Sequence, residues 1–357
     1  MPGDRRAGDR FAGVRALADE AIAARATPAV VVEVGRRKGL VWREAFGTLT
    51  WDQDARPCAG DTVFDLASLT KVIATATIAM RQVERDLVAL DAPVASLSAS
   101  WRGDDRDAVT VRQLLDHSSG LPAHARLFEH LRGAEAFERA IGRLPLETAP
   151  GTTAAYSDVG FMLLGFVLQR TGGAPLDEQF AAFGLDSADE PLTYRPGAGL
   201  RSRTAPTEFD PWRNRLLVGE VHDENAFALG GVAAHAGLFG AAGAVGRFAR
   251  LVLETFVADT PLGTPEGLAR FVSRSAVPGS TRALGWDTMK PTSSCGRRMS
   301  PAAIGHTGFT GTSLWIDPGQ DVYVVLLANR VHPSREPNRW APRRAPIHDA
   351  IIDALDD

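Results

Sequence analysis

The chain has 357 residues, 45% of them hydrophobic, and a formal net charge of −4 at pH 7. This length can bury a large core, as one large domain or two closely packed ones. The charge gives no reason to expect a nucleic acid partner. The two cysteines, Cys58 and Cys295, fit no metal or redox spacing and are interpreted as free thiols.

The N-terminal segment contains no apolar stretch of the length found in signal peptides. The most apolar long stretch, residues 228–246, is built from Gly and Ala and is too weakly hydrophobic to span a bilayer. We therefore expect a cytoplasmic protein without a membrane span, or a secreted one if a leader was removed from this chain.

The predicted elements form strands near both ends of the chain and helices between them. In chain order they are a helix over 9–25, a β-hairpin over 28–47, mainly helices over 75–240, a strand-turn-strand unit over 312–330 and a helix over 346–355. This order predicts an α+β fold, with residues 1–75 and 241–357 forming a domain around a central antiparallel sheet. Residues 76–240 form an inserted, mainly helical domain in this interpretation, and the active site lies between the two domains.

The segment "FDLASLTKV" (64–72) places Ser68 three residues before Lys71. Apolar residues recur at helical spacing from Leu69 onward, so Ser68 is predicted at the start of a buried helix. Ser68 could simply cap this helix. Alternatively it is a nucleophile, because the lysine amine one turn away can reach its hydroxyl. In that case burial must lower the pKa of Lys71, or another group must help to remove the proton.

Two further segments offer partners for Ser68. Tyr156 stands in "YSD", before a helical apolar pattern, and His306-Thr307-Gly308 is predicted to open a strand at the centre of the sheet. The motifs S-x-x-K, Y-S-D and H-T-G resemble, in order and spacing, the S-x-x-K, Y-x-N and K-T-G elements of the serine β-lactamase and penicillin-binding-protein superfamily, in particular its class C-like branch.

This resemblance implies an antiparallel sheet flanked by helices and an acyl-enzyme mechanism. Ser68 would be the nucleophile, with Lys71 and Tyr156 sharing the base role. The oxyanion hole would be the backbone N–H groups of Ser68 and Phe309. No metal and no cofactor would be required.

Two positions depart from the superfamily pattern. Asp158 replaces the usual Asn; it cannot donate a hydrogen bond, and it would favour a charged Lys71. His306 replaces Lys, so the site loses a fixed cation for a substrate carboxylate, although the histidine could hydrogen-bond or tune Tyr156. Both changes disfavour an efficient β-lactamase or D-alanyl-D-alanine peptidase.

The segment "GEVHDENAFALGGVAAHAGLFG" (219–240), with 64–75, "LGWDT" (284–288) and the region following His306, is similar to exo-acting N-acetylmuramyl-L-alanine amidases of this superfamily. His222-Asp223-Glu224 could be a polar surface loop, a substrate-contacting loop or a metal site. His235 could be a hydrogen-bonded histidine in a tightly packed Gly/Ala segment, or it could line the cleft.

We therefore expect a serine hydrolase that cleaves the N-acetylmuramyl-L-alanine amide of muropeptides and acts as a monomer. Its expected catalytic residues are Ser68, Lys71, Tyr156 and His306, and its expected substrate-binding residues are Asp158, His222, His235, Thr307 and Gly308. The alternatives are a β-lactamase-like carboxylesterase, a weak β-lactamase or D,D-peptidase, and a ligand-binding relic of the fold. His117 and His124, which flank "SSGLP", are interpreted as structural.

Overall fold

The computed structural model describes residues 10–356. Its strands are β1 (Ala29–Arg36), β2 (Gly39–Gly47), β3 (Val63–Asp65), β4 (Leu192–Tyr194), β5 (Phe209–Asp210), β6 (Arg215–Leu216), β7 (Leu238–Ala241), β8 (Asp287–Thr288), β9 (Ile304–Thr307), β10 (Ser313–Asp317) and β11 (Val322–Ala328). Its α-helices are α1 (Ala12–Ala23), α2 (Thr77–Glu84), α3 (Val94–Leu97), α4 (Val111–Leu115), α5 (Ala134–Ile141), α6 (Asp158–Gly172), α7 (Leu176–Ala181), α8 (Ala198–Arg201), α9 (Glu224–Ala228), α10 (Ala242–Thr255), α11 (Pro265–Val272) and α12 (Arg344–Asp356). A π-helix, η1 (Lys71–Ala76), runs into α2, and two 3₁₀ turns are η2 (Leu127–Glu129) and η3 (Ala341–Arg343).

The main sheet is antiparallel and draws its strands from both ends of the chain, as the sequence predicts. Its order is β2-β1-β11-β10-β9-β8. Smaller sheets are formed by β3-β7-β4 and by the hairpin β5-β6. The predicted α+β class is therefore confirmed.

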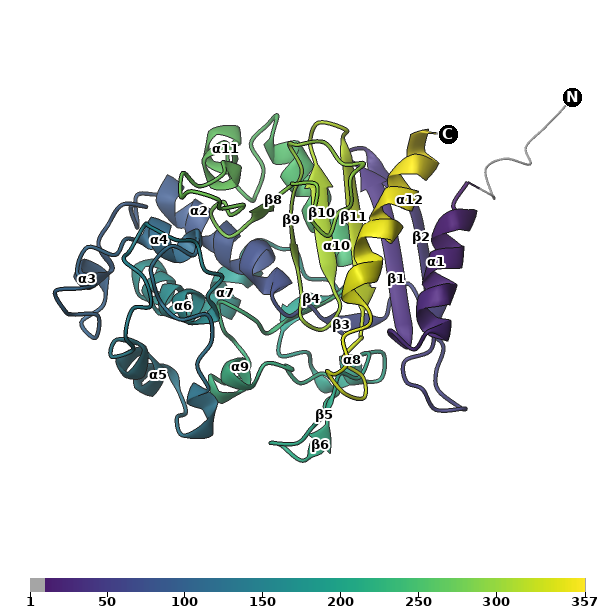
Figure 1. The fold of residues 1–357 in the computed structure, drawn as a ribbon, viewed down its shortest axis with the longest axis horizontal. Coiled ribbons are helices and arrows are strands. Elements are labelled where there is room, and N and C mark those ends of the chain that lie inside the picture. The colour runs from purple at the N-terminus through teal and green to yellow at the C-terminus, as the bar shows by residue number, and fades with distance from the viewer. Residues whose placement is uncertain (1–9, 357) are drawn as a thin grey trace, which may run out of the picture.

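Both faces of the main sheet are buried, and alternate residues of its central strands enter two separate cores. Val31 and Val325 belong to the core on the side of α10, whereas Val30 and Val324 belong to the core on the side of α1 and α12. Figure 1 shows α12 and α1 on one face of the sheet and α10 on the other. This double cover explains why β11 is an unbroken apolar run rather than an alternating one.

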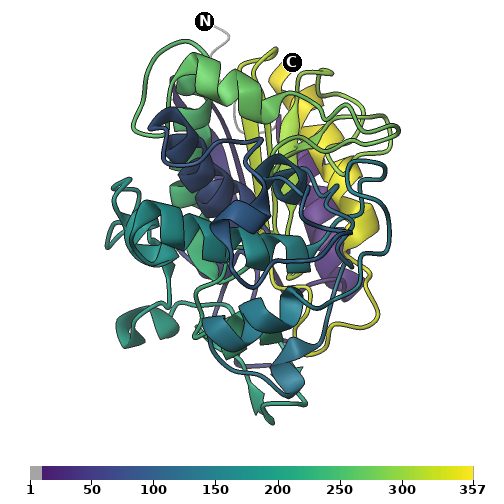
Figure 2. The same cartoon turned by 90° about the vertical axis from the view of Figure 1, so that its left-hand side faces the viewer.

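The helical half of the molecule surrounds α6, whose residues 159–168 are all buried. A helix that is apolar on every side lies inside a core rather than on a surface. Helices α2 to α5 and α7 lie around α6 on the side of the molecule that faces the viewer in Figure 2. The division into domains at 75/76 and 240/241 stays a prediction.

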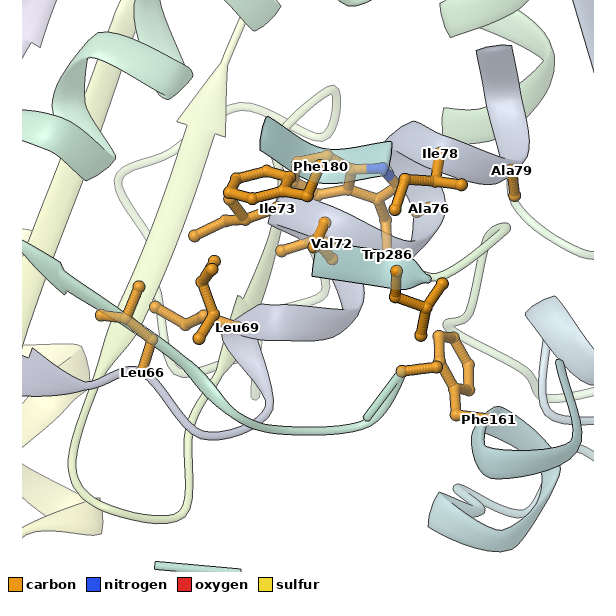
Figure 3. Packing of buried hydrophobic residues seen from close by; sticks show 14 of the residues in the cluster. Leu66, Leu69, Val72, Ile73, Ala76, Ile78, Ala79, Phe161, Phe180 and Trp286 are labelled. Atoms are coloured by element: carbon orange, nitrogen blue, oxygen red, sulfur yellow. The ribbon is translucent and has the colours of Figure 1, made fainter. Parts of the chain in front are cut away.

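The helix that follows Ser68 begins where the sequence predicts, but its first part is a π-helix. Every residue of η1 is buried, and Leu69, Val72 and Ile73 pack beneath Phe180 and Trp286 (Figure 3). Single π-helical turns occur frequently at functional sites.

The prediction for His306-Thr307-Gly308 is wrong in two respects. His306 and Thr307 end β9 rather than opening a strand, and β9 lies next to the edge strand β8 rather than at the sheet centre. The chain turns between β9 and β10, and the Gly308 N–H donates to the Thr312 carbonyl across this turn. The apolar run of β10 begins only after the turn, so it belongs to a different strand from the histidine.

Candidate active site

Ser68 lies in a turn immediately before the buried helix, and its hydroxyl meets two side chains. Lys71 Nζ donates to Ser68 Oγ at 3.0 Å, and the Tyr156 hydroxyl donates to the same oxygen at 2.8 Å. In the described part of the chain no backbone N–H donates to this oxygen, so Ser68 is not a helix cap there. Its oxygen instead accepts hydrogen bonds from Lys71 and Tyr156, the two side chains that could transfer its proton.

The turn that carries Ser68 is held in a strained conformation. Ala67 has a φ of +47°, a region that residues with a Cβ rarely adopt. Its N–H donates to Asp65 Oδ1 at 2.8 Å, and Asp65 Oδ2 accepts the N–H of His222 at 2.6 Å. The buried Asp65 carboxylate, which no sequence motif indicated, thus connects the turn that carries Ser68 to the backbone of His222.

Tyr156 reaches Ser68 because it stands just outside the first turn of α6. Ser157 caps this helix by accepting the Gly160 N–H. The Ser157 N–H donates to His117 Nδ1 at 3.0 Å, and the His117 ring packs against the Tyr156 ring with centroids 4.7 Å apart. His117 therefore supports the tyrosine, which agrees with its structural interpretation.

Lys71 is completely buried and all three hydrogens of its ammonium group have acceptors. These are Ser68 Oγ, Asp158 Oδ1 at 2.7 Å and the His235 carbonyl at 3.0 Å. Burial is the largest single effect and would lower the lysine pKa, but the interactions of the lysine with Asp158 and Tyr156 together outweigh burial, so the pKa of Lys71 is raised. The same pairing holds the pKa of Asp158 well below its ordinary value, against the effect of burial.

Tyr156 is also protonated at rest. Burial raises the pKa of its phenol, and the nearby Lys71 cation only partly opposes this. Asp158 therefore favours a charged lysine, as the sequence predicts, without creating a phenolate in compensation. One proton must leave the Lys71–Tyr156 pair before the pair can accept the proton of Ser68.

The N–H groups of Ser68 and Phe309 are free to bind an oxyanion. Within residues 10–356 neither donates to a backbone or side-chain oxygen. Phe309 is 48% exposed and lines the cavity beside Ser68. Arg330 holds its carbonyl with an Nε–O distance of 2.7 Å, which fixes the orientation of the turn that presents the N–H.

His306 lines the cavity but does not hydrogen-bond Tyr156, which corrects one of the roles expected for it. Its Nδ1 donates to the carbonyl of Thr307 at 2.8 Å, and the two rings only pack against each other, with centroids 5.7 Å apart. Burial, with the positive charges of Arg282 and Lys71, lowers its pKa well below the ordinary value. A neutral imidazole thus stands at the position that the lysine occupies in a K-T-G motif.

Residues 222–225 form one wall of the cavity rather than a surface loop. His222 is buried, its Nε2 lies 2.9 Å from Glu208 Oε2, and its ring stacks on Phe309. Asp223 caps α9 by accepting the Ala226 N–H. Within residues 10–356 no group of three or more His, Cys, Asp or Glu side chains is arranged to hold a metal ion.

His235 does not line the cavity, contrary to one of its two predicted roles. Its imidazole is 99% buried behind Asp223, with Nε2 2.8 Å from Asp223 Oδ1. What His235 gives the site is its backbone carbonyl, the third acceptor of Lys71. The side chain is therefore a hydrogen-bonded histidine in a tightly packed segment, the other interpretation allowed by the sequence.

These groups surround a cavity of about 710 Å³, and Thr307 and Gly308 line it as predicted. Five arginines, which no pattern in the sequence indicated, also line this cavity. They are Arg126, Arg282, Arg330, Arg335 and Arg344.

Two of these arginines are buried without a carboxylate partner. Among the described residues Arg330 and Arg344 form no ion pair, and each is 7% exposed. Arg344 Nη2 donates to the Gly308 carbonyl at 2.9 Å. Burial, with the neighbouring Arg330 cation, lowers the pKa of Arg344 to about 10. Cations of this kind favour an anionic group in the cavity.

A further correction concerns the structural role expected for His124. Its side chain is 70% exposed and lies in the cavity, with Nδ1 3.0 Å from Asp158 Oδ2. The hydrogen bond to Asp158 raises its pKa above the ordinary value. Its position 34 residues before Asp158 gave no signal of this contact in the sequence.

A serine hydroxyl held by a lysine and a tyrosine, with two free N–H groups beside it, is suited to acyl transfer through a serine ester. The chain matches the model of the Beta-lactamase family over residues 14–348. It therefore belongs to this family and is a serine hydrolase, and the predicted superfamily is confirmed.

Curated relatives carry two different names. An Escherichia coli K12 protein named "Putative D-alanyl-D-alanine carboxypeptidase" is 30% identical, over 90% of this chain and 83% of that protein. A Bacillus subtilis protein named "N-acetylmuramyl-L-alanine amidase" is 30% identical, over 82% of this chain and 75% of that protein.

Among solved structures, a penicillin-binding protein homologue from Caulobacter crescentus aligns with a TM-score of 0.77 and 20% identity, covering 97% of this chain and 98% of that one. At this identity the likeness shows the fold. Between residues 10 and 356 no helix is both long enough and apolar enough to cross a membrane.

Proposed function

We propose that this protein cleaves the amide between the lactyl group of N-acetylmuramic acid and the L-alanine of muropeptides. The observation that carries the proposal is the convergence of Lys71 and Tyr156 on the Ser68 hydroxyl at the edge of the large cavity. The amidase from Bacillus subtilis, at 30% identity, supports this choice of substrate.

In the proposed reaction Ser68 Oγ attacks the lactyl carbonyl carbon and passes its proton to the Lys71–Tyr156 pair. The carbonyl oxygen becomes an oxyanion between the N–H groups of Ser68 and Phe309. The C–N bond then breaks, and the leaving amine of the peptide takes a proton from Tyr156. Water, deprotonated by the same pair, then attacks the ester carbon; the bond to Ser68 Oγ breaks, this oxygen takes a proton back from the pair, and N-acetylmuramic acid is released.

The lining of the cavity favours a substrate with free carboxylates. Arg330 and Arg344 are buried in its wall and form no ion pair with a described residue, and a guanidinium suits bidentate recognition of a carboxylate. A peptide stem supplies such a group, whereas a small neutral ester does not. This feature favours a muropeptide over the carboxylesterase alternative.

The second candidate is a D-alanyl-D-alanine carboxypeptidase. It is favoured by the name of the Escherichia coli relative and by the same two arginines, which could take a terminal carboxylate. It is disfavoured by His306, which is neutral where a cation would bind that carboxylate in related enzymes.

One substrate separates these candidates. N-acetylmuramyl-pentapeptide would be incubated with the wild type, with Ser68→Ala and with Ser96→Ala, a control at an exposed serine, and the products identified by mass spectrometry. Release of N-acetylmuramic acid by the wild type and the control, but not by Ser68→Ala, is the expected result. Release of D-alanine alone would establish the carboxypeptidase, and an intact substrate with p-nitrophenyl esters still hydrolysed would favour the esterase.

Two further expectations stay predictions. The protein is proposed to be a monomer, which light scattering coupled to gel filtration tests. It is also proposed to act in the cytoplasm on recycled cell-wall fragments, which fractionation of cells that express the natural gene tests.

A further inference from the structure

The carboxylate of Asp158 contacts two basic side chains, one at each oxygen. Oδ1 accepts from the buried Lys71 at 2.7 Å, and Oδ2 lies 3.0 Å from Nδ1 of His124. The lysine side chain is fully buried, whereas the His124 side chain is 70% exposed in the cavity. An unbroken chain of contacts therefore runs from Ser68 through Lys71 and Asp158 to an imidazole in contact with solvent.

A cation at His124 would counteract an effect of Asp158 that hinders proton transfer from Ser68. A charged carboxylate at this distance stabilises the ammonium form of Lys71, yet only the neutral amine can take the proton of Ser68. A second cation on the same carboxylate opposes that stabilisation, because it repels the lysine charge and shares the charge of Asp158. An asparagine in place of Asp158 would need no such partner.

We propose that His124 is a positioning residue: as an imidazolium on Oδ2 of Asp158, it weakens the hold of that carboxylate on Lys71 and so allows the lysine to accept the proton of Ser68. Lys71 first gives one proton to solvent, and then takes the Ser68 proton as Oγ bonds to the substrate carbon. Asp158 stays a carboxylate and His124 stays an imidazolium throughout. This inference depends on the proposed roles of Ser68 and Lys71, and not on the muropeptide substrate.

The charged groups that act on His124 are Asp158, Lys71 and Asp223, and His235 also acts on Asp158. Lys71 and His235 are buried, and His235 is hydrogen-bonded to Asp223. Of these groups His124 has the most exposed side chain, at 70% against 30% for Asp223. Because its pKa lies above the ordinary value, the imidazolium form predominates below neutral pH and is lost as the pH rises through that raised pKa.

The test measures how fast Ser68 reacts with a fluorophosphonate probe as a function of pH. This reaction needs an activated serine but no amide substrate, so failure of the amidase proposal would leave the measurement valid. The variants are His124→Gln, which can keep a hydrogen bond without the charge, and His124→Lys, which keeps a charge. His130→Gln is the matched control, because His130 is exposed and outside the lining of the cavity. Thermal melts check that each variant is folded.

At pH 6.5 the His124→Gln rate is expected to fall about tenfold, the change produced by one unit in the lysine pKa. His124→Lys should stay within about threefold of the wild type, and His130→Gln should match the wild type. In an Asp158→Asn background the His124→Gln change should have a clearly smaller effect, because the carboxylate that couples the two cations and raises the pKa of His124 is gone and only their direct repulsion is left.

The inference is overturned if His124→Gln reacts like the wild type at all pH values. It is also overturned if the loss is equally large in the Asp158→Asn background, since His124 would then act by another route. An unlabelled wild type would overturn both this inference and the proposed nucleophile.

Discussion

Replacing Asp158 by asparagine should make Lys71 a better base. The pair is separated by 2.7 Å, with the lysine side chain fully buried and the aspartate side chain 15% exposed. Coulomb's law with an effective dielectric constant near 20 gives an attraction of about 6 kcal/mol at this distance, from which the cost of burying the two charges must be subtracted. Charge pairs this close commonly shift a pKa by ~1–3 units, so the pKa of Lys71 should fall by about that amount.

The assay is the pH dependence of the rate at which Ser68 is labelled by a fluorophosphonate. The pKa of Lys71 is raised in the native protein, so the wild-type rate should climb with pH as the lysine loses its proton. In Asp158→Asn the whole rising limb should move to lower pH, by ~1–3 units. Asparagine can still accept a hydrogen bond from Lys71, so the geometry is retained.

The reasoning would be refuted by a rising limb that stays in place or moves to higher pH. In the first case Lys71 would not be the group whose ionisation limits the reaction, and Tyr156 would take that role. In the second case Asp158 would be needed for something other than the charge it places beside the lysine.

Three other substitutions have defined outcomes. Tyr156→Phe removes the 2.8 Å hydrogen bond to Ser68 and should lower kcat for amide hydrolysis by roughly 10²–10⁴-fold with an unchanged fold; full activity would remove Tyr156 from the mechanism. Gly308→Ala would place a Cβ 2.0 Å from Thr312 Oγ1 and should distort the oxyanion turn, lowering activity and Tm, whereas Gly199→Ala, with open space around it, should match the wild type in both. Leu327→Ala, in the buried central strand β11, should lower the free energy of unfolding in urea by about 2–5 kcal/mol; a loss below about 1 kcal/mol would mean that the core closes around the cavity.

The sequence by itself determined the fold class and singled out Ser68 as the candidate nucleophile. Apolar periodicity after Ser68 marks a helix, and the apolar runs at both chain ends mark strands, because burial imposes a regular spacing on each kind of element. The order of the three motifs was enough to place the chain in its superfamily. The motif order could not show that β9 ends at Thr307, because it does not indicate where the chain turns between β9 and β10.

Only the tertiary structure decided which groups surround the Ser68 hydroxyl and Lys71. Lys71 meets Asp158 across 87 residues of chain and the His235 carbonyl across 164 residues, and His124 joins them from the cavity. Contacts between distant segments leave no periodic trace in a sequence, and a backbone carbonyl has no residue identity to signal its role. The raised pKa of Lys71 is the balance between burial and charges brought together from these segments, so it exists only once the chain has folded.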